Sequence, residues 1–362
     1  MKVKLGDITK IKTGKLDANA ASEDGQYPFF TCSRETLRIS TYSYDCECVL
    51  VAGNGDLNVK YYKGKFDAYQ RTYIIEDNSR GRLYMPYLYY FMECYVEELR
   101  KQAIGGVIKY IKLGNLTDAL IELPSVVEQK AIVNILEKAK SILDKRSEEL
   151  SNMDELIKAR FVEMFGDLRK NTKGWKVKKF EEITNLITDG EHTTPKRVEN
   201  GIYLLSARNI LNHSIQLEDV DYINQEEYER ITKRVIPQEG DVLISCSGTV
   251  GRCCSVPLGL KFQMVRSVAL LRFKKSINPV FAEYMITSDY LQEQINKSKT
   301  VSSQANLFQG KIKTLNGFVP PIEFQNQFSD FVRAIDKSKV VLQKSLDETQ
   351  ILFDSLMQKY FG

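Results

Sequence analysis

The feature that most constrains this chain is that its sequence occurs twice within its 362 residues. Residues 4–9 resemble residues 179–184, and residues 29–31 match residues 204–206 at the same offset of 175. The offset later grows to 193, which indicates an insertion in the second copy, and from Pro124 onward it stays at 196 without gaps. A repeat of nearly half the chain is far longer than the roughly 20 to 50 residues of a solenoid repeat. It indicates the duplication of a whole module.

Each copy begins with short β-branched and aromatic runs that are broken by glycine turns, such as residues 49–55 and 242–251. Such runs, mixed with a few helical patches, predict an α+β domain. Each copy then ends with one long helical pattern. We therefore expect two similar α/β-mixed domains, each followed by a long helix: a first domain at 1–122, a helix at 123–166, a second domain at 167–320 and a helix at 321–362.

The first long helix has a specific start signal. After Pro124, Ser125 and Glu128 fit a capping box, in which the two side chains bind the first free N–H groups of a helix. Apolar residues then recur every seven positions on one face, and the second helix repeats this seam in register. The seam comprises Leu136, Leu143, Leu150, Ile157, Val332, Leu342, Leu346 and Phe353. It predicts an intramolecular coiled coil. Either direction is open to it, and we expect antiparallel pairing.

Composition and missing motifs argue against an enzyme. Two histidines, His192 and His213, leave little room for a histidine-based metal or acid–base site. The chain has no phosphate loop, dinucleotide fingerprint, zinc-protease motif or nucleophile elbow. Its seven cysteines include no C-x-x-C pair, so we expect buried or incidental thiols, no metal and no cofactor. Without a signal peptide or an apolar run of membrane-spanning length, a cytoplasmic protein with no membrane partner is expected.

Basic side chains cluster locally, although the net charge is only +4. Phosphate binding needs a local patch of lysine and arginine rather than a large total charge. Two similar domains on a helix pair also match the geometry of proteins that read two half-sites of duplex DNA. Solvated strand faces explain the charges equally well, and strand packing explains most of the tyrosines among them. The patches are Lys60, Lys63, Lys65 and Arg71 beside Tyr69, and Lys196, Arg197 and Arg208 in the second domain.

Three motifs follow one another in the second copy, namely residues 188–196 (TDGEHTTPK), 206–210 (SARNI) and 240–251 (GDVLISCSGTVG). Their order resembles that of one protein family, the specificity subunits of type I restriction-modification systems. The entry to the first helix, Leu123-Pro124 followed by Glu128-Gln129, is similar to the family's conserved helix entry, and Pro320-Pro321 with Gln325 is a second instance. The first domain departs from the pattern, because it has only residues 13–15 (TGK) in place of the full loop. Phe324 replaces the glutamate of the second helix entry.

The resemblance implies a non-catalytic protein whose two target recognition domains each read half of a bipartite sequence in double-stranded DNA. Its paired helices would carry two methyltransferase subunits, and these in turn the restriction subunits. The candidate DNA contacts are Thr13, Lys15, Asn54, Lys63, Lys65, Tyr69, Arg71, Gly190, His192, Thr193, Lys196, Arg197, Arg208, Asn209, Ser247, Thr249 and Arg252. Among them, the lysines at 63, 65 and 196 are expected at phosphates, and Arg71, Arg208 and Asn209 at bases.

Parts of the sequence are compatible with three other functions. Residues 278–281 (NPVF) approach a methyltransferase motif, but Pro279 aligns with Pro86 where a helix is expected to begin. Residues 128–130 (EQK) could suggest a nuclease, but Glu128 already has a capping role. The strongest rival is an adaptor that grips protein or carbohydrate with two modules on a coiled coil. For His192, a DNA contact and a structural hydrogen bond are equally expected, and His213 is given no role.

Overall fold

The structure is a computed structural model and describes residues 2–299 and 306–362. Its contacts divide the chain into two compact units: unit 1 comprises Met1–Glu149 with Leu342–Gly362, and unit 2 comprises Leu150–Val341. Each unit contains one mixed domain and part of each long helix. The α+β class predicted from the two kinds of periodicity is confirmed.

In unit 1 a six-stranded sheet has the order β2 (Thr9–Thr13), β7 (Thr72–Asp77), β5 (Tyr44–Ala52), β6 (Val59–Ala68), β3 (Tyr27–Phe30) and β4 (Leu37–Ile39). All pairs are antiparallel except β3 with β6. A small second sheet joins β1 (Lys2–Lys4) to β8 (Leu120–Glu122). The helices are α1 (Leu5–Ile8), η1 (Ala18–Ala20), α2 (Met85–Gln102) and α3 (Leu113–Thr117). The core forms where the apolar face of α2 packs on β5 and β7, because alternate strand residues such as Val49 and Ile75 point toward it.

In unit 2 one sheet has the order β10 (Thr184–Asp189), β18 (Val268–Phe273), β15 (Val242–Ser245) and β16 (Cys253–Ser255). Another has β14 (Asp221–Ile223), β11 (Ile202–Leu205) and β17 (Phe262–Met264). Two pairs complete the unit: β12 (Ile210–Leu211) with β13 (Ser214–Ile215), and β9 (Lys176–Lys179) with β19 (Asn316–Val319). The helices are α5 (Phe180–Ile183), η2 (Ala207–Asn209), α6 (Gln225–Thr232), α7 (Pro279–Thr287), α8 (Asp289–Ser298) and α9 (Gln309–Lys313).

The two sheets of unit 2 correspond to the single sheet of unit 1. The long strand β6 is divided in the second copy into β16 and β17, which are separated by a stretch that contains Pro257 and Gly259. Proline cannot donate to a strand ladder, and Gly259 adopts a φ of 79°, so the chain leaves the sheet here. The parallel pairing of β3 with β6 is retained as that of β11 with β17.

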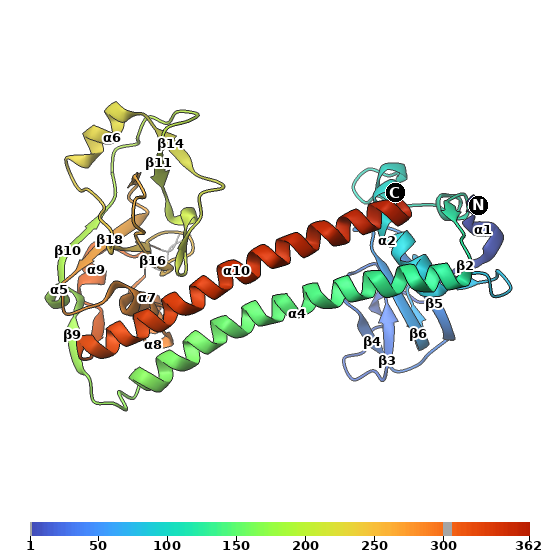
Figure 1. Ribbon diagram of the computed structural model, residues 1–362, viewed down its shortest axis with the longest axis horizontal. Helices are drawn as coiled ribbons and strands as arrows, with labels where there is room; N and C mark the ends of the chain where they lie inside the picture. Colours follow the sequence, from blue (N-terminus) through green and yellow to red (C-terminus); the bar gives the residue numbers. More distant parts are fainter. Residues whose placement is uncertain (1, 300–305) are drawn as a thin grey trace. The chain divides into compact units, whose positions relative to one another are not determined.

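The long helices are α4 (Val126–Phe165) and α10 (Ile322–Phe361). The predicted capping box is present: the N–H of Glu128 donates to Ser125 Oγ at 3.3 Å, and the N–H of Ser125 donates to Glu128 Oε2 at 2.9 Å. Figure 1 shows the two helices running along one another. In unit 1 the start of α4 packs with the end of α10, where Arg146 Nη1 donates to Ser345 O at 2.6 Å.

In unit 2 the opposite ends meet, and the rings of Phe161 and Phe328 lie 5.4 Å apart. The helices therefore pair antiparallel, as expected. Of the seam residues, Leu136, Ile157 and Val332 are buried, and Leu143, Leu150, Leu342, Leu346 and Phe353 are half-buried. Arg146, which interrupts the apolar pattern, is explained by its hydrogen bonds to the partner helix. Within the described residues, no helix combines the length and the apolar character that a membrane crossing needs.

Candidate nucleic-acid interface

In the first domain, several loops lie together where β2, β5 and β6 end and β7 begins. We call this end of the six-stranded sheet the loop edge. The chain leaves β2 at Gly14, whose N–H donates to Thr72 O at 3.0 Å, and the N–H of Lys15 donates to Ala68 O at 3.2 Å. Gly14 is required here, because an added Cβ would collide with the carbonyl oxygens of Ala68 and Tyr69. The loop after β2 is thus fixed directly against the turn after β6.

The second domain repeats this arrangement. The N–H of Gly190 donates to Val268 O at 3.0 Å, and the N–H of Glu191 donates to Met264 O at 2.8 Å. A Cβ at Gly190 would collide with the carbonyl oxygens of Met264 and Val265. The two loop edges are therefore the same structure built twice, which is the three-dimensional form of the sequence repeat.

Two adjoining hollows lie at this edge of the second domain, with volumes of about 660 and 450 Å³. Ser247 and Ser267 line both of them. The candidates His192, Thr193 and Arg197 line the larger hollow, and Arg208, Thr249 and Arg252 line the smaller one. The structure thus brings together seven candidates, including Ser247, that lie in or directly after three separate sequence motifs.

Carboxylates hold several of these side chains in place. His192 Nε2 lies 2.8 Å from Asp189 Oδ2, and Arg234 pairs with the other oxygen of Asp189. Glu191 accepts from the N–H of Thr193 at 3.1 Å. Burial alone would raise the pKa of Glu191, but the hydrogen bonds from Thr193 and Arg230 lower it below the usual range. His192 therefore has a structural hydrogen bond and is also exposed at the hollow.

One carboxylate binds two of the candidate arginines. Asp221 Oδ2 accepts from Arg197 Nε at 2.8 Å, and Asp221 Oδ1 accepts from Arg208 Nη2 at 3.0 Å. Burial opposes ionisation of this group, yet the two guanidinium groups lower the pKa of Asp221. Asp221 was not singled out in the sequence, because only the pairing of β14 with β11 places it beside both arginines.

Arg266 is a second residue of this site that the sequence motifs do not indicate. It is exposed and lines the larger hollow. Its guanidinium group, like that of Arg252, has no ion pair with the part of the chain that the structure describes. The offset of 193 read from this part of the sequence does not relate Arg266 to the candidate stretch 69–71, and only the matching hydrogen bonds of Gly14 to Thr72 and of Gly190 to Val268 do so.

Two candidates are corrected. Asn209 is buried, accepts from the N–H of Ser206 at 2.9 Å and donates to Gln216 O at 3.1 Å, so its amide organises the loop and does not face a base. Gly190 is buried beneath the loop edge, where its role is steric. Lys196 has an exposed side chain, while its N–H donates to Glu227 Oε1 at 3.2 Å.

In the first domain the candidates fall into two groups. Thr13, Lys15, Asn54, Tyr69 and Arg71 belong to the loop edge, where the N–H of Gly53 donates to Arg71 O at 2.8 Å. Lys63 and Lys65 lie instead on β6 itself, opposite Glu47 and Asp45 on β5. Lys63 Nζ is 3.2 Å from Glu47 Oε2, and Lys65 Nζ lies 4.6 Å from the centre of the Tyr42 ring. The structure does not bring these two lysines to the loop edge.

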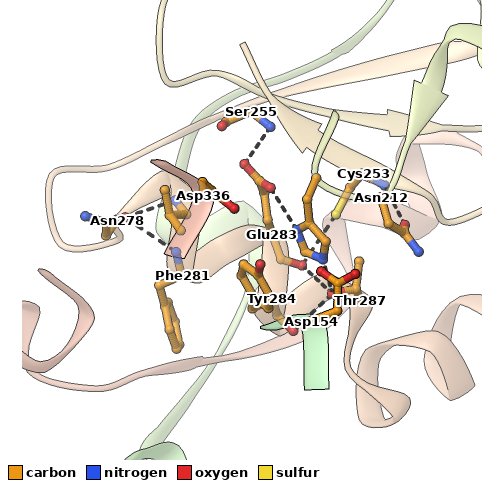
Figure 2. Close-up of polar contacts among 12 residues, drawn as sticks. Asp154, Asn212, Cys253, Ser255, Asn278, Phe281, Glu283, Tyr284, Thr287 and Asp336 are labelled. Atoms are coloured by element: carbon orange, nitrogen blue, oxygen red, sulfur yellow. Dashed lines mark hydrogen bonds and ion pairs between the residues drawn. The ribbon is translucent and has the colours of Figure 1, made fainter. Parts of the chain in front are cut away.

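The enzyme-like motifs have structural roles. Asn278 caps α7 by accepting from the N–H of Val280 at 2.9 Å, and Pro279 occupies the first helical turn. His213 Nδ1 lies 2.9 Å from Glu283 Oε2, and its ring stacks on Tyr284 at 4.0 Å. Figure 2 shows Glu283 also accepting from the backbone N–H of Ser255. Among the cysteines, Cys48, Cys246, Cys253 and Cys254 are buried.

Comparison with known proteins follows the same division of the chain. A family model described as the type I restriction modification DNA specificity domain matches residues 1–152 and 172–349. The EcoDI specificity subunit of Escherichia coli is 39% identical over 156 residues, which cover 43% of this chain and 34% of that protein. The chain thus spans about a third of that relative's length. The MjaVIII specificity subunit of Methanocaldococcus jannaschii is 19% identical over 96% of this chain and 88% of its own.

Solved structures match over the full length. The crystal structure of the type I restriction-modification S subunit from M. genitalium has a TM-score of 0.65 at 16% identity, covering 100% of this chain and 96% of that one. A chain from a structural study of type I complex assembly and conformational transition has a TM-score of 0.58 at 16% identity, covering 100% of this chain and 97% of that one. At this identity the likeness establishes the fold.

Proposed function

Because the chain belongs to the type I restriction-modification DNA specificity family, we propose that it is a sequence-specific DNA-binding subunit which reads a bipartite target in duplex DNA. The observation that carries the proposal is the loop edge that is built twice on the same backbone hydrogen bonds. Each edge presents arginine and small polar side chains to solvent. One edge would read one half of the target, and the other edge the second half.

The chemistry of the second edge suits duplex DNA. The guanidinium groups of the half-buried Arg252 and the exposed Arg266 attract phosphates, and arginine also forms paired hydrogen bonds with the guanine edge in the major groove. Ser247 lines both hollows and Thr249 lines the smaller one, and their hydroxyls can bind either bases or phosphates. Charged and polar groups of this kind favour DNA over the carbohydrate or protein ligand of an adaptor.

The long helices support a role in assembly. Several large apolar residues of α4 and α10 remain exposed in the chain alone, namely Val127, Ile135, Ile142, Leu156, Val162, Val340, Val341, Ile351 and Leu352. Exposed apolar surface of this extent marks a protein interface. We propose that two methyltransferase subunits bind there and carry the restriction subunits. Methylation and cleavage would then reside in those partners, and this chain would itself be non-catalytic.

The test is a domain exchange. Residues 1–122 are replaced by the matching domain of a relative, and the methylated sequence is mapped in cells that carry the methyltransferase partner. We expect one half of the motif to change and the other to remain. A change in both halves would contradict independent reading. A gel shift with random duplex over a salt series tests the adaptor alternative, because only a DNA reader loses affinity linearly on a log–log plot.

A further inference from the structure

The carboxylate of Asp221 divides its two oxygens between two arginines. Oδ2 binds the Nε of Arg197 at 2.8 Å, and Oδ1 binds an Nη of Arg208 at 3.0 Å. The Asp221 side chain is 27% exposed, whereas the two arginine side chains are 47% and 48% exposed. Asp221 therefore binds one nitrogen of each guanidinium group, and the other N–H donors of these half-exposed side chains remain accessible to a ligand.

The strand pairing itself does not require this carboxylate. In the second domain Asp221 of β14 lies opposite Leu204 of β11. In the first domain the equivalent residue of β3 is Phe29, and the residue opposite it on β4 is Leu37. Leucine thus occupies the same register position in the same fold. The acid is a feature of the second domain alone, where both arginines are present.

Positioning matters for an arginine that reads a base. Paired hydrogen bonds to guanine need the guanidinium plane to be held in one orientation, whereas attraction to phosphate does not. A free arginine loses rotamer entropy when it binds, and a clamped one has already lost it. The two arginines also line different hollows, Arg197 the larger and Arg208 the smaller. One carboxylate therefore fixes a side chain in each.

We propose that Asp221 is a positioning residue that sets sequence discrimination in the second domain by fixing Arg197 and Arg208 for base contacts. The proposal rests on the DNA-reading function proposed above. It makes Asp221 necessary for selectivity although it carries the same charge as DNA. Its loss lowers discrimination without weakening general attraction to the duplex.

The test uses the full chain and a pool of duplex DNA with random sequence, from which bound molecules are sequenced. For Asp221→Asn we expect the preference for the selected half-site over random duplex to fall by about 10-fold, the value of one paired arginine–base contact. Affinity for random duplex should hold or rise, because a negative charge has been removed. The control Asp219→Asn removes a neighbouring carboxylate that lies 3.5 Å from Arg208 and does not bind Arg197. It should keep the preference.

Asp221→Leu, which installs the residue found at the first-domain position, is the second variant and should behave like Asp221→Asn. In a chain that already carries Arg197→Ala and Arg208→Ala, neither Asp221 substitution should lower the half-site preference further. A purely structural role of Asp221 would instead predict an additional loss. Unchanged selectivity in both Asp221 variants, or an added loss in that background, overturns this inference alone. A wild-type chain that selects no sequence from the pool overturns the proposed function as well.

Discussion

Gln129 and Gln325 make matching sets of hydrogen bonds in the two units, and both are fully buried. Gln129 Oε1 accepts from the N–H of Tyr84 at 2.8 Å, and Nε2 donates to Arg82 O and Pro124 O at 2.8 and 2.9 Å. Each amide thus joins the start of a long helix to the loop that begins a domain helix. The gapless offset of 196 predicted that the two residues are equivalent, but not what they bind.

Gln325 repeats each contact: Oε1 accepts from the N–H of Asn278 at 2.8 Å, and Nε2 donates to Ser276 O and Pro320 O at 3.0 and 2.8 Å. Gln129→Leu and Gln325→Leu should each lower the free energy of unfolding by about 3 kcal/mol, because three backbone groups lose the buried amide that they bind. Denaturant unfolding of the full chain measures this. Gln327→Leu, at an exposed position of the same helix, is the control and should cost less than about 0.5 kcal/mol.

The glycines at the loop edges are the second target. Gly14→Ala and Gly190→Ala should each destabilise the protein by about 1–3 kcal/mol, because the added methyl group collides with backbone carbonyls that cannot move freely. The DNA-binding loops should shift with them. Gly106→Ala and Gly310→Ala add a methyl group into open space in the same two domains. Equal melting temperatures for the loop-edge variants and these controls would contradict the steric role.

The helix seam gives a third prediction. Leu346 is half-buried and lies between Ser345 and Thr349, the two residues that bind Arg146 of the partner helix. Leu346→Asp should lower the free energy of unfolding by at least about 2 kcal/mol, because it removes apolar packing and partly buries a carboxylate in the helix seam. Ile351→Asp, which is 69% exposed on the same helix, should have little effect on the isolated chain. Circular dichroism during heating distinguishes the two.

The sequence predicted the parts of this protein that depend on local pattern. The capping box at Ser125, the heptad seam and the duplicated frame were all readable, because spacing along the chain decides each of them. The roles of the loop residues are harder to predict from the sequence. The resemblance predicts a base contact for Asn209, yet its amide turns inward and binds backbone groups. Neighbouring sequence does not indicate Asp221 or Arg266, because strand pairing places Asp221 beside its two arginines and the turn after β17 places Arg266 at the larger hollow.

Acid should weaken the second domain through its carboxylates. The hydrogen bond from Arg230 lowers the pKa of Glu227 against the opposing effect of burial, and the pKa of Asp221 and of Glu191 is also lowered. A carboxyl group whose pKa is lower in the folded state binds protons more readily when unfolded, so stability rises with pH in this range. The stabilisation that such a carboxylate contributes is complete above its pKa in the unfolded state, and it is lost as the pH falls through its pKa in the folded state.

The free energy of unfolding of the wild-type chain should therefore fall as the pH is lowered from about 6 to about 3. Glu227→Gln should reduce that fall, because the variant has no carboxyl group to protonate at this position, and its stability at pH 6 should already be lower. The exposed neighbour Glu226 provides the control, and Glu226→Gln should follow the wild-type curve more closely. Denaturant unfolding at a series of pH values measures all three chains. A Glu227→Gln curve as steep as that of the wild type would mean that the Arg230 pair does not contribute to acid sensitivity.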